Sequence, residues 1–325
     1  MINIKINENF KKYVKSVVII LLLIIIGSLI MYFSRPPENF PKKIDIEVKQ
    51  GIGISELSET LFDQKIIRSP LMLKIAVMVL GQKGKILSGE YRFNYPQNLF
   101  TIASRLSEGR FGFSKVKIVI YEGSTASDMA LIILKSIPSF NAPAFAVLAK
   151  PYEGYLLPDT YIFYENVGAR EVIKVMQDNF NKKAKPILDK YKLSQDGIKK
   201  VITIASLIEE EVRDYQDKRI VAGIIKNRMD KNMFLQFDTP FWYILNKTSA
   251  EITLKDLAMD SPYNLYKNKG LPPTPISNPG LESIEATLNP LPTKYLFFLT
   301  DKDGKVHYAE TYNEHLKNRA KYVEP

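Results

Sequence analysis

The amino-acid sequence predicts an α+β protein in which an N-terminal transmembrane helix precedes a small subdomain and a larger α+β domain. Three observations lead to this prediction. An uncharged apolar stretch lies close to the N-terminus. The chain after it mixes strand-like alternation with helical spacing of apolar residues. A long loop rich in proline and aromatic residues lies in the C-terminal third.

The apolar stretch has the length of a membrane span. Residues 17–33 are almost entirely apolar, and as a helix they would extend roughly 27 Å, close to the ~30 Å hydrocarbon core of a bilayer. The lysines that precede it are Lys5, Lys11, Lys12 and Lys15. The positive-inside rule therefore places residues 1–16 in the cytoplasm as a short tail. A cleaved signal peptide is the alternative, but no small-residue cleavage site follows, and the prolines of residues 34–43 predict a stiff linker.

The composition narrows the classes of partner. The chain has 325 residues, with 45 lysines and arginines against 35 acidic residues, and a net charge of +10. The basic residues are scattered, and because they form no patch or run we expect no nucleic-acid partner. A basic body suits anionic partners such as lipid head groups, although the charge would equally serve to solvate the surface. The absence of cysteine excludes disulfides and thiol catalysis.

Residues 44–114 predict a small subdomain with the order strand–helix–helix–strand. Ile44, Ile46 and Val48 alternate with charged residues, as in a half-buried strand, and Ser55 is the expected cap of the first helix. The second helix carries Leu71, Ile75, Val79 and Leu80, and the second strand runs from Ile86 to Phe93. This order resembles a LysM-like module, a fold associated with binding N-acetylglucosamine polymers. The alternative is a packing unit without a ligand.

A helix that ends in three glutamates, residues 201–212, gives the first strong chemical signal. Glu209 falls on the apolar stripe of Ile202, Ala205 and Val212. A carboxyl group on an apolar stripe is expected to have a raised pKa, which is the property of a general acid that works near neutral pH. We therefore predict Glu209 as the catalytic acid.

The neighbouring acids differ in their predicted surroundings. Glu210 falls on the polar side of the same helix, whereas Glu211 follows apolar residues and is expected to be partly buried. An alternative interpretation stays open for Glu209, because a buried carboxylate can also serve in a salt bridge, here to Arg219 or Arg228.

Two turn-rich segments, residues 153–161 and 261–280, mix aromatic, amide and carboxyl groups. Aromatic faces beside polar groups suit sugars, although a structural loop anchored by tyrosine is the alternative for the first segment. The only histidines, His307 and His315, lie close together, but the chain has no HExxH spacing and no cysteine. We therefore expect no metal and no cofactor.

Taken in order, several segments resemble the YceG-like endolytic murein transglycosylase family, and the likeness covers nearly the whole chain. The segments are EGYLLPDTY, ASLIEEEV, VAGIIKNRM, LQFD, SPYNLY, GLPPTPISNPG and HYAETYNEH. The resemblance implies that the catalytic glutamate directly follows the ASLI-type run, which is Glu209 here, with Glu211 as the second acid. The supporting and substrate-binding candidates are Tyr155, Asn227, Arg228, Gln236, Asp238, Ser261, Tyr263, Asn264 and Asn278. The sequence departs from the family at Asp217-Lys218, which keeps the charges, and at Thr239-Pro240 and Thr274, which would alter loop geometry rather than the reaction.

The resemblance implies a lytic transglycosylase with residues 115–325 as its catalytic domain. Such an enzyme cuts the MurNAc–GlcNAc β-1,4 bond within nascent glycan strands, leaves a 1,6-anhydro end and so terminates elongation. The implied partners are peptidoglycan glycan strands, the lipid bilayer of the cell membrane and peptidoglycan synthases, with the catalytic domain outside the cytoplasm. Two alternatives stay open: a hydrolytic glycosidase with Asp238 or Glu211 as base, and a non-catalytic glycan-binding scaffold of the wall-synthesis machinery.

Overall fold

A computed structural model gives the structure of residues 8–80, 86–245, 247 and 251–323, and the side chains of the first helix from residue 12 onward. The chain forms two compact units, Met1–Ser114 and Lys115–Pro325, which are described here one at a time. Within the described residues the strands form three two-stranded antiparallel sheets, and most of the remaining regular structure is helical. The prediction of a mixed α+β protein with an N-terminal apolar helix is confirmed.

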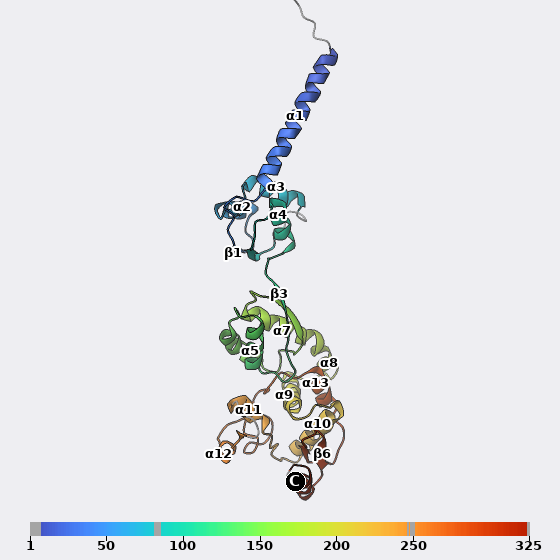
Figure 1. Cartoon of the computed structure of the whole chain (residues 1–325). Coiled ribbons are helices and arrows are strands. Elements are labelled where there is room, and N and C mark those ends of the chain that lie inside the picture. Colours follow the sequence, from blue (N-terminus) through green and yellow to red (C-terminus); the bar gives the residue numbers. More distant parts are fainter. Residues whose placement is uncertain (1–7, 81–85, 246, 248–250, 324–325) are drawn as a thin grey trace, which may run out of the picture. The chain divides into compact units, whose positions relative to one another are not determined.

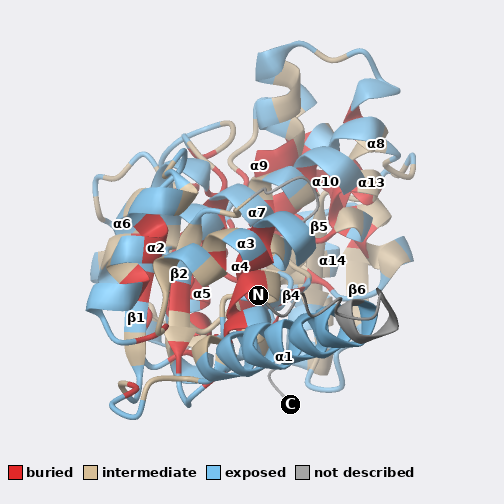
Figure 2. Cartoon of the chain, turned by 90° about the horizontal axis from the view of Figure 1, so that it is seen from above, coloured by how far each residue is buried: buried red, intermediate tan, exposed pale blue. Residues whose placement is uncertain are grey.

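The first helix, α1 (Glu8–Ser34), is long and apolar enough to cross a membrane. Its segment Lys12–Ser34 has 23 residues and a mean hydropathy of 2.9, and none of it is buried against the rest of the chain. Figure 2 shows this as an exposed ribbon along the helix. The predicted span, residues 17–33, lies inside α1, whereas the first seven residues of the predicted tail fall outside the described part of the chain.

The rest of the first unit packs three helices against one strand pair. The elements are β1 (Ile44–Val48), α2 (Ile54–Asp63), α3 (Pro70–Leu80), β2 (Gly89–Phe93) and α4 (Leu99–Glu108). β1 and β2 pair antiparallel, and their inward side chains meet apolar residues of all three helices in one core. Within unit 1 the order β1–α2–α3–β2 is the predicted one.

Two local predictions in this unit need correction, the cap of α2 and the start of β2. The N-cap of α2 is Gly53, not Ser55, because the helix already begins at Ile54. β2 begins at Gly89, not Ile86, since the backbone N–H of Leu87 bonds to the carbonyl of Leu106 and not to a neighbouring strand. The predicted apolar residues of α3 do not form its buried face, which consists of Leu73, Ala76 and Val77.

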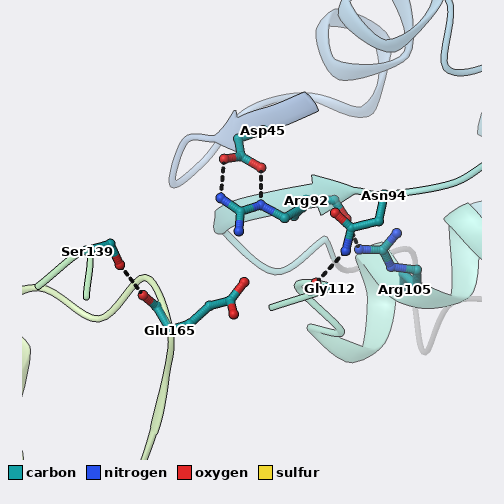
Figure 3. Close-up of polar contacts among 7 residues, drawn as sticks. All are labelled: Asp45, Arg92, Asn94, Arg105, Gly112, Ser139 and Glu165. Atoms are coloured by element: carbon teal, nitrogen blue, oxygen red, sulfur yellow. Dashed lines mark hydrogen bonds and ion pairs between the residues drawn. The ribbon is translucent and has the colours of Figure 1, made fainter. Parts of the chain in front are cut away.

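A buried arginine ties the last helix of this unit to its strands (Figure 3). The Arg105 guanidinium donates 2.8 Å hydrogen bonds to the Gln97 side chain and to the carbonyls of Arg92 and Arg110. Arg92 in turn pairs with Asp45 on the opposite strand at 2.7 Å. Each polar group that burial removes from water thus has a partner, as a stable core requires.

The second unit contains the two other strand pairs. The elements before the site are β3 (Lys115–Val119), α5 (Ala126–Ser136), α6 (Ala142–Ala149), the short helix η2 (Lys150–Tyr152), β4 (Thr160–Tyr164), α7 (Ala169–Lys183) and α8 (Lys185–Asp189). Those that follow are α9 (Gln195–Glu211), α10 (Tyr215–Asp230), α11 (Thr239–Leu245), α12 (Leu254–Leu257), α13 (Leu281–Leu288), β5 (Phe297–Thr300), β6 (Val306–Ala309) and α14 (Tyr312–Tyr322). β3 pairs with β4 and β5 pairs with β6.

Helix α9 is central to this unit, because α10, α11 and α13 all pack against it (Figure 1). Its first turn is capped by the Ser194 side chain, which accepts a hydrogen bond from the N–H of Gly197. The helix ends at Glu211 because Val212 adopts an extended conformation, with φ −146°. Asp214 then caps α10 by accepting from two backbone N–H groups, so α9 and α10 meet at a tight, capped corner.

Candidate active site

The carboxylate of Glu209 lies in a closed polar contact between three helices. Its Oε1 accepts a hydrogen bond from Lys218 Nζ of α10 at 2.8 Å. Its Oε2 accepts from the N–H of Gly280 at 2.7 Å and from the hydroxyl of Ser283 at 2.8 Å, both in the first turn of α13. The side chains of Glu209 and Lys218 are only 8% and 3% exposed. The pair therefore joins α9, α10 and α13, and the carboxylate sits at the positive end of α13.

This geometry matches the salt-bridge interpretation of Glu209, with a different partner from those predicted. Arg219 donates instead to the carbonyl of Asn289, and Arg228 to the carbonyl of Leu296. The burial of Glu209 follows from its place on the apolar stripe, as the sequence predicted. The cation that burial requires comes from Lys218.

The next two glutamates, Glu210 and Glu211, line open cavities. Burial raises the pKa of Glu210 to about 7, and the nearby Glu209 carboxylate adds to that rise. Burial likewise raises the pKa of Glu211 to about 7, with a further contribution from the charge of Asp238. The hydroxyl of Thr239 donates to Glu211 Oε1 at 3.1 Å and so orients the carboxyl group. Glu210 is only partly exposed, and α11 packs against α9.

Two cavities meet at these acids. One has a volume of about 560 Å³ and the other about 630 Å³, and they share Glu210, Thr239 and Trp242 in their walls. The first is lined further by Thr125, Ala126, Asp128, Lys150, Glu153, Tyr243, Lys247 and Ile276, among others. The second is lined further by Glu211, Arg228, Gln236, Phe237, Asp238, Tyr266, Phe298, Thr300, Tyr312 and His315, among others. Polar groups and aromatic side chains thus line a path on both sides of the glutamates.

The second cavity contains a strained residue. Gln236 has a φ of 54°, a conformation that side chains other than glycine rarely adopt, and its N–H bonds to the carbonyl of Leu265. Strain of this kind is retained where the surroundings enforce it, and such positions cluster at functional sites. Beside it, Asp238 accepts a 2.6 Å hydrogen bond from the Tyr266 hydroxyl. Glu211, Arg228, Gln236 and Asp238 are the predicted site residues that the structure brings together in this cavity.

Other predicted site residues stabilise loops through hydrogen bonds to the backbone. Asn264 is fully buried and donates to the carbonyls of Leu257 and Met259. Asn227 donates to the carbonyls of Thr293 and Tyr295. These amides satisfy backbone groups in segments that lack regular pairing, so their contacts are structural.

Asn278 and Tyr155 both serve the loop at residues 153–161. Asn278 Oδ1 accepts from the N–H groups of Gly154 and Leu156, and its amide donates to Glu153 at 2.5 Å. Tyr155 packs on Phe180 with ring centroids 5.3 Å apart.

Tyr263 and Ser261 belong to a turn at one edge of the site. The Tyr263 hydroxyl bonds to Thr274, and its N–H donates to the Ser261 hydroxyl at 3.3 Å. The structure therefore places neither of them in the walls of the two cavities.

The sequence held a signal for one missed residue, Lys218. It precedes Val221, Ala222 and Ile225 by three, four and seven residues, which puts it on the buried stripe of α10. A lysine on an apolar stripe requires an acidic partner from another element. Trp242 gave only the weak signal of being the single tryptophan of the chain.

The described residues contain no cluster of three or more His, Cys, Asp or Glu side chains that could hold a metal ion. His307 Nε2 instead lies 2.7 Å from Asp301 Oδ2, across the hairpin of β5 and β6. His315 packs against Phe297, and its pKa is lowered by burial and by the nearby charges of Arg228 and Arg319.

Known proteins resemble this chain along most of its length. The model of the YceG-like family matches residues 46–321. A Bacillus subtilis protein named endolytic murein transglycosylase is 31% identical over 92% of this chain and 91% of its own length. A protein of the same name from Streptococcus pneumoniae serotype 2 is 35% identical over 59% of this chain and 35% of its own. A crystal structure of a yceG-like protein from Listeria monocytogenes superposes with a TM-score of 0.55 at 32% identity, covering 85% of this chain and 99% of that one.

The buried pair gives a prediction about stability. Lys218→Met leaves the Glu209 carboxylate buried without its cation, which we expect to lower the free energy of unfolding by about 3–5 kcal/mol. Lys226→Met on the same helix is the control, because Lys226 makes only an exposed pair with Asp230 and should change stability little. Denaturant unfolding of the purified full chain in detergent measures both. Equal stability of the two variants would show that the pair is not structural.

Proposed function

The chain belongs to the YceG-like family, and we propose that it is a membrane-anchored endolytic murein transglycosylase. The observation that carries this proposal is the carboxyl group of Glu211, which has a pKa of about 7 and lines an open cavity beside polar and aromatic side chains. One relative that matches 92% of this chain and two that match 59% of it carry that enzyme name.

We assign the role of general acid to Glu211 in place of Glu209. A general acid must reach the substrate, and both carboxylate oxygens of Glu209 already accept bonds from Lys218 and from α13. Glu211 has one hydrogen bond, from Thr239, and a raised pKa that keeps it protonated near neutral pH. Glu210 shares the raised pKa, but its Oε1 lies against the backbone of Gly123.

In the proposed reaction, protonated Glu211 donates its proton to the glycosidic oxygen of the MurNAc–GlcNAc β-1,4 bond. As that bond breaks, the C6 hydroxyl of the MurNAc residue attacks C1, and the Glu211 carboxylate accepts the hydroxyl proton. The products are a free GlcNAc 4-hydroxyl and a 1,6-anhydro-MurNAc end, and Glu211 is again protonated. No water and no second carboxylate are needed, because the nucleophile belongs to the substrate and is already positioned.

The two-sided path favours cutting inside a strand. Because cavities lie on both sides of Glu210, sugars on either side of the scissile bond could occupy walls that include Trp242, Tyr243 and Tyr266. Aromatic faces stack on the C–H faces of sugars while neighbouring amides and carboxyls bind their hydroxyls.

Hydrolysis is the competing reaction. It would require a second carboxylate as base, and Asp238 lines the same cavity as Glu211. The Tyr266 hydroxyl donates a 2.6 Å hydrogen bond to Asp238 Oδ1, which leaves that oxygen less available to a water molecule and favours the lytic reaction. Product mass separates the two, since an anhydro end lacks one water. A non-catalytic scaffold would give no product at all.

The first test concerns the acid. Glu211→Gln keeps the shape of the side chain but cannot donate a proton, so glycan cleavage should fall by at least the roughly 10²–10⁴-fold typical of general acid catalysis. Glu210→Gln is the matched control and should keep most activity. Cleavage of purified glycan strands by the full chain in detergent, followed by mass spectrometry, measures both. Normal release of anhydro ends by Glu211→Gln would contradict the assignment.

The pH profile gives an independent reading of the same group. Because the acid acts in its protonated form and its pKa is about 7, kcat/KM should decline as the pH rises through 7. The measurement is the pH profile of kcat/KM on soluble glycan strands. If an exposed glutamate with an ordinary pKa supplied the proton, the decline would occur well below pH 7, at about pH 4–5.

We also propose an orientation for the anchor. Four lysines precede the apolar stretch at residues 17–33 and three basic residues stand in the linker that follows it, which favours a cytoplasmic N-terminus and an extracytoplasmic second unit, next to wall synthases. Alkaline phosphatase fused after Pro325 should therefore be active in cells. An inactive phosphatase fusion, together with an active cytoplasmic reporter at the same site, would reverse the orientation and remove access to the wall.

We further propose that residues 44–114 form a LysM-like glycan-binding unit. The order β1–α2–α3–β2 with an antiparallel strand pair supports this assignment. The full chain with Glu211→Gln should then co-sediment with insoluble peptidoglycan more strongly than a matched chain lacking residues 44–114. Equal sedimentation would leave this unit as a spacer.

A further inference from the structure

Helix α3 exposes apolar side chains where a soluble unit would present polar ones. Leu71, Ile75, Met78 and Val79 are 65%, 41%, 67% and 76% exposed. Their spacing of four, three and one residues puts them on one side of the helix, opposite the buried residues of the same helix. Lys74 is the only charged residue of α3. A helix that is apolar on all sides is normally buried on all sides, in a core or in lipid.

The helix begins next to the end of the membrane anchor. The Arg68 guanidinium lies 4.8 Å from the centre of the Tyr32 ring, in the last turns of α1, and Arg68 Nε donates to the Pro36 carbonyl at 3.0 Å. α3 starts two residues later, at Pro70, and contacts α1 and α4. Figure 1 shows α3 at the base of α1. The exposed apolar face therefore starts close to the C-terminal end of α1.

We propose that the outer face of α3 inserts into the lipid surface beside the anchor, as a second membrane contact of the first unit. This inference rests on the proposed anchoring of α1. With 11 residues, α3 would extend about 16 Å, too short to cross a bilayer and long enough to lie in its interface. Lipid is the occupant because the anchor already brings the bilayer to the start of α3.

The surroundings of α3 fit a phospholipid surface. A groove of about 510 Å³ between the end of α1 and the end of α2 is lined by Tyr32, Phe33, Phe62, Lys65, Ile67 and Arg68, together with Pro37, Glu38 and Asp63. Aromatic rings are favoured at the level of lipid head groups, and the cations Lys65 and Arg68 can bind phosphate oxygens. Phe62 is 44% exposed and adds to the apolar surface on this side.

A second contact would change what the anchor does. A single helix fixes the height of the first unit but leaves it free to rotate about the helix axis and to tilt. Insertion of α3 would hold one side of that unit against the membrane. The first unit would then have a defined orientation relative to the membrane surface.

The absence of cysteine allows a direct test with single labels. Ile75→Cys and Val79→Cys in the full chain are labelled with an environment-sensitive fluorophore and placed in nanodiscs of phosphatidylcholine and phosphatidylglycerol. The emission of both labels should shift to the blue and be quenched at least twofold by spin-labelled lipid. Glu59→Cys, on the exposed side of α2, is the matched control and should stay unquenched. Leu23→Cys, within α1, reports insertion of the anchor.

Each outcome decides the inference. Quenching at positions 23, 75 and 79 but not at 59 supports it. Quenching at position 23 alone, with labels on α3 in water, overturns it and leaves the anchor intact. A blue shift at 75 and 79 without quenching by lipid means that protein covers α3, which also overturns it. Absence of quenching at position 23 overturns the proposed anchoring itself.

Discussion

The site depends on the buried ion pair between Glu209 and Lys218. Two charges with side-chain exposures of 8% and 3% are stable only together, because each alone would be a charge without solvation. The carboxylate also accepts from the first turn of α13, so one side chain fixes the relative position of three helices. This constraint determines where the last turn of α9 ends, and with it where Glu211 lies.

The pair explains how adjacent glutamates take different roles. Successive residues of a helix point about 100° apart, so Glu209 turns toward α10 and α13 while Glu210 and Glu211 turn toward α11 and the cavities. Both carboxylate oxygens of Glu209 accept hydrogen bonds, from Lys218 and from the first turn of α13. Glu211 is buried and lies near the carboxylate of Asp238, and both conditions favour its protonated form. Of the three consecutive glutamates, Glu209 therefore has a structural role and Glu211 the proposed chemical one.

The uncharged apolar stretch predicted the helix α1, and helical periodicity predicted the course of α9 and the burial of Glu209. It could not predict the partner of Glu209, because spacing within one helix says nothing about which side chain of another helix faces it. The same limit applies to the loops. Asn264 and Asn278 were predicted to bind substrate, since amides in a turn-rich loop suit sugars, but loops without regular pairing also need buried amides to satisfy their own backbone. Sequence alone does not separate these two uses of asparagine.

The most direct test of this account is the activity of the double variant Glu209→Gln, Lys218→Met. The glutamine can still accept from Gly280 and Ser283, and removal of both charges leaves none uncompensated, so the fold should survive. If Glu209 is structural and Glu211 is the acid, the purified double variant releases anhydro-ended fragments from glycan strands at a rate near that of the unmodified chain. A folded double variant that releases none would show that Glu209 itself carries the chemistry.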